Sequence, residues 1–277
     1  MELFVCFLFG LAIGSFLNVC IARIPEESVV HPRSRCPQCR KLIAWYDNFP
    51  VLSYLILRGR CRNCKKSISA RYPGVEILTA AISVLLYLKF GLSVEWGIYL
   101  LFSAALVTLA FIDMDRRILP FSITINGIWI GILVNVVLEW PSAFASKWLD
   151  YAGFGGLSPK WVALIASLAG AVICGGFLWM VGAAVTRVMG VEAMGFGDVV
   201  MMAMVGAFLG APLALLTIMI GSVLGAIIGI SFIVISGKGK RYELPFGTFL
   251  GFAGIIALLW GNSLINWYWV HMIQPAL

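Results

Sequence analysis

Charged side chains are scarce in this chain, and one long stretch has none. Only 12% of the 277 residues are Asp, Glu, Lys or Arg, while 61% are hydrophobic and the mean hydropathy is +0.97. Soluble domains carry about 25% charged residues. The run 199–235 has no formal charge at all, and one helix needs only about 20 apolar residues to cross a bilayer. This composition excludes an ordinary soluble domain and predicts an all-α, polytopic membrane protein.

The apolar segments divide into about eight predicted transmembrane helices. They are expected at 3–22, 74–88, 96–112, 118–138, 161–186, 196–211, 213–235 and 245–268. The 199–235 run is too long for one helix, so we divide it at Gly210-Ala211-Pro212. The first segment has no basic residue before its apolar stretch, whereas a secretory signal peptide has a positive n-region. We therefore expect a membrane anchor that is retained.

Basic residues are nearly absent from one side of this topology. With eight spans, 17 of the 20 Lys and Arg fall on one face, 11 of them within 23–72, and only three fall opposite. The positive-inside rule makes the basic face cytoplasmic and both termini external. The basic loop lacks aromatic–basic interleaving beyond Trp45-Tyr46, so we expect contact with membrane lipid and no nucleic acid.

Four of the seven cysteines form two CxxC pairs in the basic loop. "CPQC" contributes Cys36 and Cys39, and "CRNC" contributes Cys61 and Cys64, with 21 residues between the pairs. Each short turn brings two thiolates to one ion, which is typical of a tetrahedral four-cysteine zinc site. A redox pair is the alternative, although disulfides are disfavoured in the cytoplasm. Because protein would fill all four positions, we predict structural zinc that supplies much of the folding energy of this loop.

Acidic residues within or beside the spans are rare, and each is a functional hypothesis because it is costly there. Asp113 and Asp115 stand in "FIDMDRRILP", and Asp198 stands in "MGFGDVV". The predicted topology places the end of the third span, at Asp113, and the start of the sixth, near Asp198, at similar cytoplasmic depth. Two close carboxylates can share one proton, one serving as base toward water and the other as acid toward the scissile carbonyl. This is the chemistry of an aspartyl protease.

Two of the three aspartates also have a simpler explanation. Asp198 could be a helix N-cap, a common role for Asp before an apolar run, and Asp115 stands beside two arginines on a predicted solvated loop. Gly195 and Gly197 could allow backbone or substrate to approach closely. In a membrane, such irregular backbone persists only where it lines a protein-walled or watery cavity.

Several ordered motifs together resemble the type IV prepilin peptidases, which are related in motif to the GxGD intramembrane aspartyl proteases. The motifs are "GLAIGSFLNVCIARIP" (10–25), the CxxC pairs, "SARYPGVEILTA" (69–80), "FIDMDRRILP" (111–120), "EAMGFGDVVMMAMVGAFLG" (192–210) and "LPFGTFLGFAG" (244–254). The two catalytic aspartates of the family fall on Asp113 and Asp198. The chain departs from the family at Phe121, where Asp is usual, and at Val200, where Lys is usual. Both departures could change how the charged substrate is bound or how readily the aspartates ionise.

This resemblance implies cleavage of the short basic leader of type IV prepilins or type II secretion pseudopilins. Cleavage is expected at the cytoplasmic side of the bacterial inner membrane, after the glycine that precedes the mature first residue. The resemblance also implies N-methylation of the new amino terminus with S-adenosylmethionine. No GxGxxG fingerprint marks a place for this methyl donor, and the zinc-binding loop with the "GSFLNV" segment is its expected location.

The predicted domain organisation has three parts. Residues 1–22 are the first transmembrane anchor, residues 23–73 are a cytoplasmic zinc-binding loop domain (the four-cysteine lobe), and residues 74–277 are a multi-helix transmembrane aspartyl protease domain. An ion-coupled transporter with a zinc lobe is the alternative, but it predicts carboxylates near the midplane and an internal repeat, and neither is visible. A noncatalytic assembly scaffold would need no aspartate pair.

Overall fold

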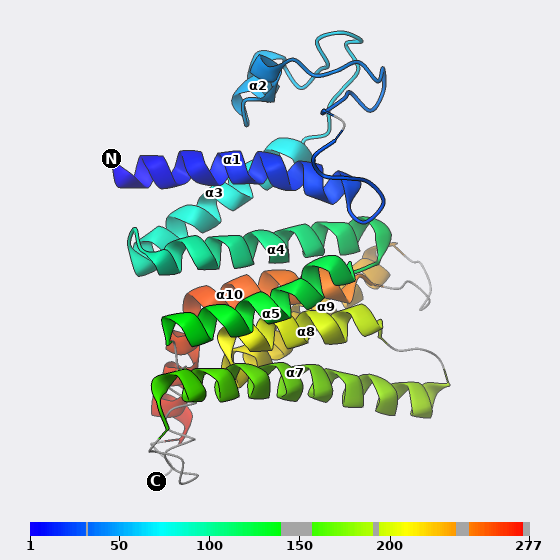
Figure 1. The fold of residues 1–277 in the computed structure, drawn as a ribbon. Coiled ribbons are helices and arrows are strands. Elements are labelled where there is room, and N and C mark those ends of the chain that lie inside the picture. The colour runs from blue at the N-terminus through cyan, green and yellow to red at the C-terminus, as the bar shows by residue number, and fades with distance from the viewer. Residues whose placement is uncertain (32, 140–156, 191–193, 237–243, 274–277) are drawn as a thin grey trace. The chain divides into compact units, whose positions relative to one another are not determined.

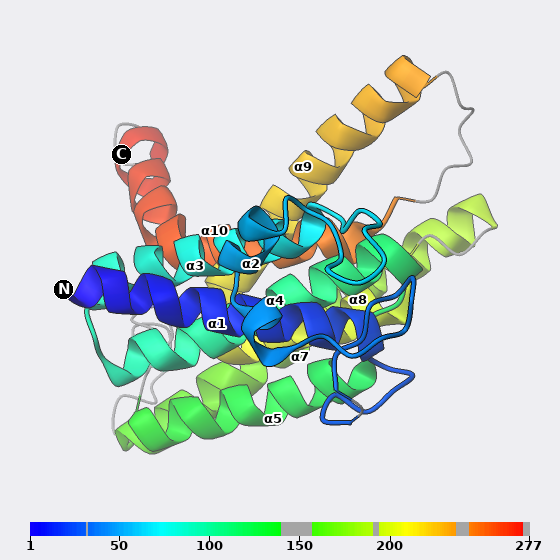
Figure 2. The same cartoon turned by 90° about the horizontal axis from the view of Figure 1, so that it is seen from above.

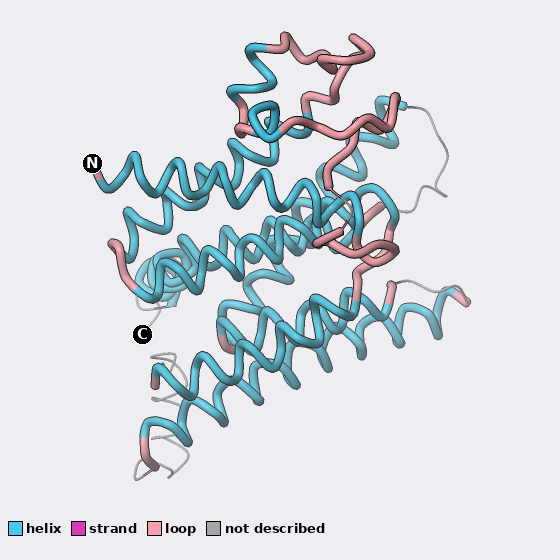
Figure 3. The backbone as a smooth tube through the Cα atoms, turned by 45° about the horizontal axis from the view of Figure 1, so that its top comes forward, coloured by secondary structure: helices cyan, strands magenta, loops and turns pink. Residues whose placement is uncertain are grey.

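The computed structural model describes residues 1–31, 33–139, 157–190, 194–236 and 244–273. In these residues nearly all regular structure is helical and no strand is present (Figure 3). The elements are α1 (Glu2–Arg23), a 3-10 turn η1 (Trp45–Asn48), α2 (Leu52–Ile56), α3 (Arg71–Phe90), α4 (Val94–Arg116), α5 (Phe121–Leu138), α7 (Pro159–Met189), α8 (Phe196–Leu209), α9 (Ala211–Ser236), α10 (Phe246–Tyr268) and a π-helical turn η2 (Trp269–Ile273). The all-α fold predicted from composition is confirmed.

Seven helices in the described part of the chain are long and apolar enough to cross a membrane. They are α1, α3, α4, α5, α7, α9 and α10, and they match seven of the predicted spans. The predicted span 196–211 is also a helix, α8, but it has only 14 residues, fewer than the ~20 that cross a bilayer. Most of its residues are buried, so α8 is apolar because it packs inside the protein.

The division of the long uncharged run is as expected. Helix α8 ends at Leu209, and Gly210 adopts φ 77° and ψ 166°, a positive-φ conformation that glycine takes without steric cost. Helix α9 then begins at Ala211.

Packing divides the chain into two compact units, Met1–Ile112 and Asp113–Leu277. In the first unit, α1 lies along α3 (Figure 1). Gly10 and Gly14 face α3 so closely that a Cβ atom on either would lie 2.6 Å from an α3 Cα atom, that of Ala80 or Glu76 respectively. Small residues spaced by four positions allow membrane helices to approach in this way.

In the second unit, α8 packs against two neighbouring helices, α5 and α7 (Figures 1 and 2). Gly170 of α7 and Gly206 of α8 are in backbone contact, and neither has space for a side chain. The amide of Asn135 in α5 donates to the carbonyl of Ala207 at 2.7 Å and to Ser167 Oγ at 3.0 Å. These buried hydrogen bonds tie three helices together and fix the position of α8.

Candidate active site and metal site

Asp113 lies in the last turn of α4 and is 6% exposed. Its Oδ2 atom accepts two hydrogen bonds from Thr248, one from the backbone N–H at 2.7 Å and one from the hydroxyl at 3.0 Å. Thr248 is in the first turn of α10, where backbone N–H groups lack intrahelical partners and attract negative charge. The amino-terminal end of α10 therefore positions the Asp113 carboxylate.

Asp198 lies in the first turn of α8 and is 8% exposed. The N-cap interpretation is wrong, because the N-cap is Gly195 and no side chain caps this helix. The N–H of Asp198 donates to the Gly195 carbonyl at 3.1 Å, while its buried Oδ1 has no hydrogen-bond partner among the described residues. A buried oxygen without a partner is rare in proteins and calls for a chemical explanation.

The two carboxylates face the same small gap beside Gly247. A Cβ atom on Gly247 would lie 3.0 Å from Asp198 Oδ1 and 3.1 Å from Asp113 Oδ2. The oxygens are therefore close enough for one water molecule to contact both, since each such contact spans about 2.5–3.2 Å. The structure brings together the two aspartates that topology placed at similar depth. Their catalytic roles remain a prediction.

Leu119 covers one side of this pair. A Cβ atom on Gly197 would lie 2.9 Å from Leu119 Cβ, and one on Gly247 would lie 2.8 Å from Leu119 Cδ1. Gly197 thus allows the Leu119 side chain to approach closely, whereas the nearest atom to a Cβ on Gly195 is Asp198 Oδ2 at 3.7 Å. The expected irregular backbone is not found, because Gly197 lies within α8 and neither glycine has a positive φ. The sequence reasoning did not identify Gly247, Thr248 or Leu119 as site residues, although the motifs "LPFGTF" and "DRRILP" contain them.

The two departures from the family pattern, Phe121 and Val200, lie at the start of α5 and within α8. Phe121 begins α5, is 48% exposed, and its ring meets that of Phe196 edge-on with centroids 6.2 Å apart. Val200 is buried in α8. Asp115 is exposed in the last turn of α4, which agrees with its interpretation as a solvated residue.

The four lobe cysteines converge on one point. Their sulfur atoms all lie within 4.8 Å of one another, and Cys36 Sγ is 3.9 Å from Cys64 Sγ. A tetrahedral zinc ion with Zn–S bonds of about 2.3 Å places its sulfur ligands about 3.8 Å apart. All four are free thiols, so the donor set fits zinc in number, element and spacing.

The two CxxC turns have the same backbone geometry. In each, the N–H of the first cysteine donates to the carbonyl five residues later, at 3.0 Å in the first turn and 2.9 Å in the second. The residue after the second cysteine, Arg40 or Lys65, is left-handed with φ 58° or 59°. This conformation costs a non-glycine residue about 1–2 kcal/mol, so both turns depend on the contacts that close them.

Backbone donors prepare this cluster for a cation. The N–H groups of Cys64 and Asn63 hydrogen-bond to the Cys61 sulfur and lower its pKa to about 6. The Lys66 N–H also favours ionisation of Cys64, but burial and the neighbouring sulfurs outweigh it and raise the pKa of Cys64 to about 11. The Cys61 thiolate therefore forms readily, whereas the neighbouring sulfurs oppose ionisation of Cys64. A divalent cation relieves that repulsion.

Two family models match the parts of the chain that contain these two sites. The Bacterial Peptidase A24 N-terminal domain matches residues 8–90, and the Type IV leader peptidase family matches residues 100–230. A prepilin leader peptidase/N-methyltransferase of Aeromonas salmonicida (strain A449) is 37% identical, with 95% of this chain and 92% of the relative covered. The chain belongs to the type IV leader peptidase family. The first match contains the four cysteines and the second contains both aspartates.

Other type IV leader peptidase relatives agree. Proteins with the same name are 36% identical in Legionella pneumophila, with 94% of this chain and 92% of the relative covered, and 34% identical in Pseudomonas aeruginosa PAO1, with 94% and 91% covered. No solved structure matches the chain. The resemblance seen in the motifs is confirmed. Family membership favours a multi-pass membrane peptidase over an ion-coupled transporter.

Proposed function

We propose that this protein cleaves the leader of type IV prepilins or type II secretion pseudopilins with Asp113 and Asp198 and then N-methylates the exposed amino terminus. One observation carries the peptidase assignment: two buried carboxylates from different helices each have an oxygen about 3 Å from the same point, the Cβ position of Gly247. The names of the relatives support both activities.

The hydrogen bonds suggest a division of roles. Asp113 accepts two hydrogen bonds at one oxygen, as an ionised base does, while Asp198 has an oxygen without a donor and is assigned the proton. In this scheme Asp113 takes a proton from water, and the water oxygen attacks the scissile carbonyl. Asp198 protonates that carbonyl oxygen. The tetrahedral intermediate then collapses, the C–N bond breaks, Asp113 returns its proton to the amine, and the carbonyl oxygen returns its proton to Asp198.

The surroundings of the pair suit the expected substrate. Prepilins carry a basic leader followed by an apolar helix, and the ring pair of Phe121 and Phe196 lies at the start of α8, where Phe196 precedes Asp198 by two residues. We propose that these rings contact the apolar segment after the cleavage site. The excess of Lys and Arg in 23–72 supports placing the site at the cytoplasmic side of the bacterial inner membrane.

We further propose that zinc is structural in the four-cysteine lobe and that S-adenosylmethionine is the methyl donor. The functional parts then remain as predicted, with the anchor at 1–22, the lobe at 23–73 and the protease domain at 74–277. When bound, zinc joins the two CxxC turns through Cys36, Cys39, Cys61 and Cys64.

The decisive experiment is cleavage of a purified prepilin in detergent by wild type, Asp113→Asn and Asp198→Asn, followed by mass spectrometry. We expect each Asn variant to lose at least about 10³-fold in kcat/KM, within the range for removal of an acid–base group. Asp115→Asn is the matched control, because it changes a nearby exposed carboxylate, and it should keep activity within about 3-fold. Near-normal cleavage by either buried-site variant would reject the pair.

A further inference from the structure

An exposed apolar segment of the four-cysteine lobe has no part in the peptidase chemistry or in the cysteine cluster. Six large hydrophobic side chains are exposed between 45 and 56, namely Trp45, Tyr46, Phe49, Leu52, Leu55 and Ile56. The exposed fraction is 70% for Trp45, 64% for Leu55 and 66% for Ile56. Apolar surface gathered in this way marks a contact with a partner or a membrane. A lobe surrounded only by water gives no physical reason for this exposure.

Three of these side chains share one face of α2. Leu55 and Ile56 follow Leu52 by three and four positions, which brings all three to the same side of a helix. Ser53, which belongs to the same helix, is buried. Helix α2 therefore turns a polar residue toward the interior of the lobe and an apolar face away from it.

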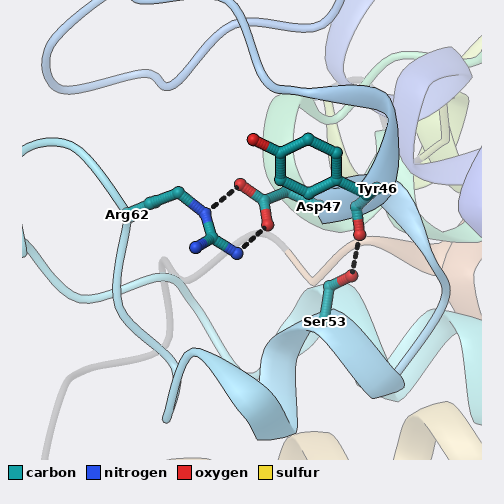
Figure 4. Close-up of polar contacts among 4 residues, drawn as sticks. All are labelled: Tyr46, Asp47, Ser53 and Arg62. Atoms are coloured by element: carbon teal, nitrogen blue, oxygen red, sulfur yellow. Dashed lines mark hydrogen bonds and ion pairs between the residues drawn. The ribbon is translucent and has the colours of Figure 1, made fainter.

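Polar contacts hold the aromatic residues beside this face. Ser53 Oγ donates to the Tyr46 carbonyl at 3.2 Å, which joins α2 to η1 (Figure 4). Arg62 lies against Asp47 in a two-pronged pair, with Nε–Oδ2 at 2.8 Å and Nη2–Oδ1 at 2.6 Å (Figure 4). The turn η1 is thus tied both to α2 and to the second CxxC turn. We call the exposed residues of this segment the apolar edge, which consists of Trp45, Phe49, Leu52, Leu55 and Ile56.

The start of α2 is attached to a helix that is long and apolar enough to cross a membrane. The backbone N–H of Val51 donates to Oε2 of Glu76, a buried residue of α3, at 2.7 Å. Glu76 comes five residues after Arg71, where α3 begins. Because a helix rises 1.5 Å per residue, the contact lies about 7–8 Å along α3 from its end at the lobe. In agreement, α2 lies beside α1 and within the length of that helix (Figures 1 and 2).

This depth is that of the border between lipid headgroups and acyl chains. Helices that lie in this border bury their apolar face about 5–10 Å into it. At the depth of Glu76 the surface of the spans is apolar as well, since Phe16 of α1 and Ile77 of α3 have exposed fractions of 56% and 50%. Aromatic residues are enriched at such borders, and the Trp45 and Phe49 rings meet edge-on with centroids 6.3 Å apart. The apolar edge therefore continues the lipid-facing surface of α1 and α3.

Positive charges follow the apolar edge directly. Arg58 and Arg60 are exposed and come within four residues of the end of α2. The N–H of Arg58 donates to the Leu55 carbonyl at 3.0 Å, so the chain turns back sharply after the apolar face. Long arginine side chains reach headgroups while their stems lie along apolar surface, and basic residues at the membrane surface attract anionic lipids. Depth and charge together favour a lipid surface as the partner of this segment.

We propose that the apolar edge inserts into the membrane leaflet nearest the lobe and that Arg58 and Arg60 bind anionic phospholipid headgroups beside it. The four-cysteine lobe is then held against the membrane along 45–56, whereas the sequence predicted a lobe in the cytoplasm. This lipid contact depends on neither the peptidase nor the methylation assignment, because none of its residues belongs to the aspartate pair or to the cysteine cluster.

The test is photocrosslinking of full-length, zinc-loaded protein in nanodiscs of phosphatidylcholine and phosphatidylglycerol. With p-benzoylphenylalanine in place of Leu55, intact mass spectrometry should show a lipid adduct, because the excited ketone inserts into C–H bonds that it contacts. Leu133 of α5, which is 62% exposed, provides the lipid-facing reference. Leu42 is the matched control, since it is an exposed leucine of the first CxxC turn, outside the apolar edge. It should form about 5-fold less lipid adduct than residue 55.

The headgroup preference is read from the same adducts. The ratio of phosphatidylglycerol to phosphatidylcholine adducts at residue 55 should exceed that at residue 133 by about 3-fold or more. The double variant Arg58→Gln/Arg60→Gln should lower it to the ratio at residue 133. Lys65→Gln removes a charge from the second CxxC turn instead and should leave the ratio within about 2-fold. Zinc content and prepilin cleavage are measured on every variant to establish that it is folded.

Three results would overturn the inference. Residue 55 crosslinked to protein in place of lipid would mean that another part of the chain or a second copy covers the apolar edge. Equal lipid adducts at residues 42 and 55 would mean that 45–56 is not the segment that inserts. Equal headgroup ratios at residues 55 and 133 would remove the role of the two arginines.

Discussion

The two sites of this protein are built by different means. Apart from the short elements η1 and α2, the four-cysteine lobe has little regular structure. It is ordered by converging sulfurs, the Arg62–Asp47 ion pair and turns that include left-handed residues. The aspartate pair instead lies at helix ends that pack closely because Gly197 and Gly247 have no side chain. A site held by an ion and a site held by helix packing should fail under different perturbations.

The largest expected effect is at the helix-packed site. Gly247→Ala would place a methyl group about 3 Å from both carboxylates, and misplacement of reacting groups by about 1 Å can cost 10²-fold in rate. We expect prepilin cleavage to fall by at least about 10²-fold while zinc content stays normal. Gly176→Ala is the control, because nothing lies within 4 Å of its Cβ position. Equal cleavage by both variants would show that the gap is not needed.

Removal of the metal should affect the other site. Cys36→Ser should lose the ~1 zinc per chain expected of such a site and loosen the lobe, while cleavage of prepilin falls by less than about 10-fold. Zinc affinity should also weaken as pH falls, because protons compete for the thiolates. Metal analysis and hydrogen exchange across 33–70 provide the measurements. A zinc-free variant whose lobe keeps the hydrogen-exchange protection of wild type would contradict a structural role for the metal.

A smaller effect is expected at Thr248. Thr248→Val removes one of the two hydrogen bonds to Asp113 and keeps the backbone donor, so cleavage should fall by about 10-fold, as expected for one hydrogen bond to a charged group. Thr248→Ser retains the hydroxyl and should restore most of the activity. The pH profile of kcat should shift in Thr248→Val and return to the wild-type profile in Thr248→Ser. A Ser variant as impaired as Val would indicate a packing role.

The smallest effect concerns the ion pair of the lobe. Hydrogen bonding from Arg62 lowers the pKa of Asp47, so this carboxylate stays ionised well below neutrality and its contribution to stability is lost only when pH falls through that lowered value. The difference in melting temperature between wild type and Asp47→Asn should therefore be small and constant from pH 8 to pH 5. Thermal scans of zinc-loaded protein test it. A difference that shrinks across this range would mean that Arg62 does not hold the carboxylate ionised.

Local patterns in the sequence predict the helices and much of the chemistry. The cysteine spacing predicts the cluster, and the positive-inside rule places Asp113 and Asp198 at one depth. Hydropathy could not show that α8 is shorter than a span, because buried and lipid-facing helices have the same composition. The contact between Asp113 and Thr248 joins residues 135 positions apart, and no local pattern reveals which helix end faces which.

The close crossing of α1 and α3 at Gly10 and Gly14 also bears on how the chain acquires its structure. Once both helices are inserted and paired, the two ends of the four-cysteine lobe are held near each other before any metal binds. The entropy of closing this long loop is then lost during membrane insertion rather than during zinc binding. The same residues cut free from the helices would have to lose that entropy on capturing the ion, and would bind it more weakly.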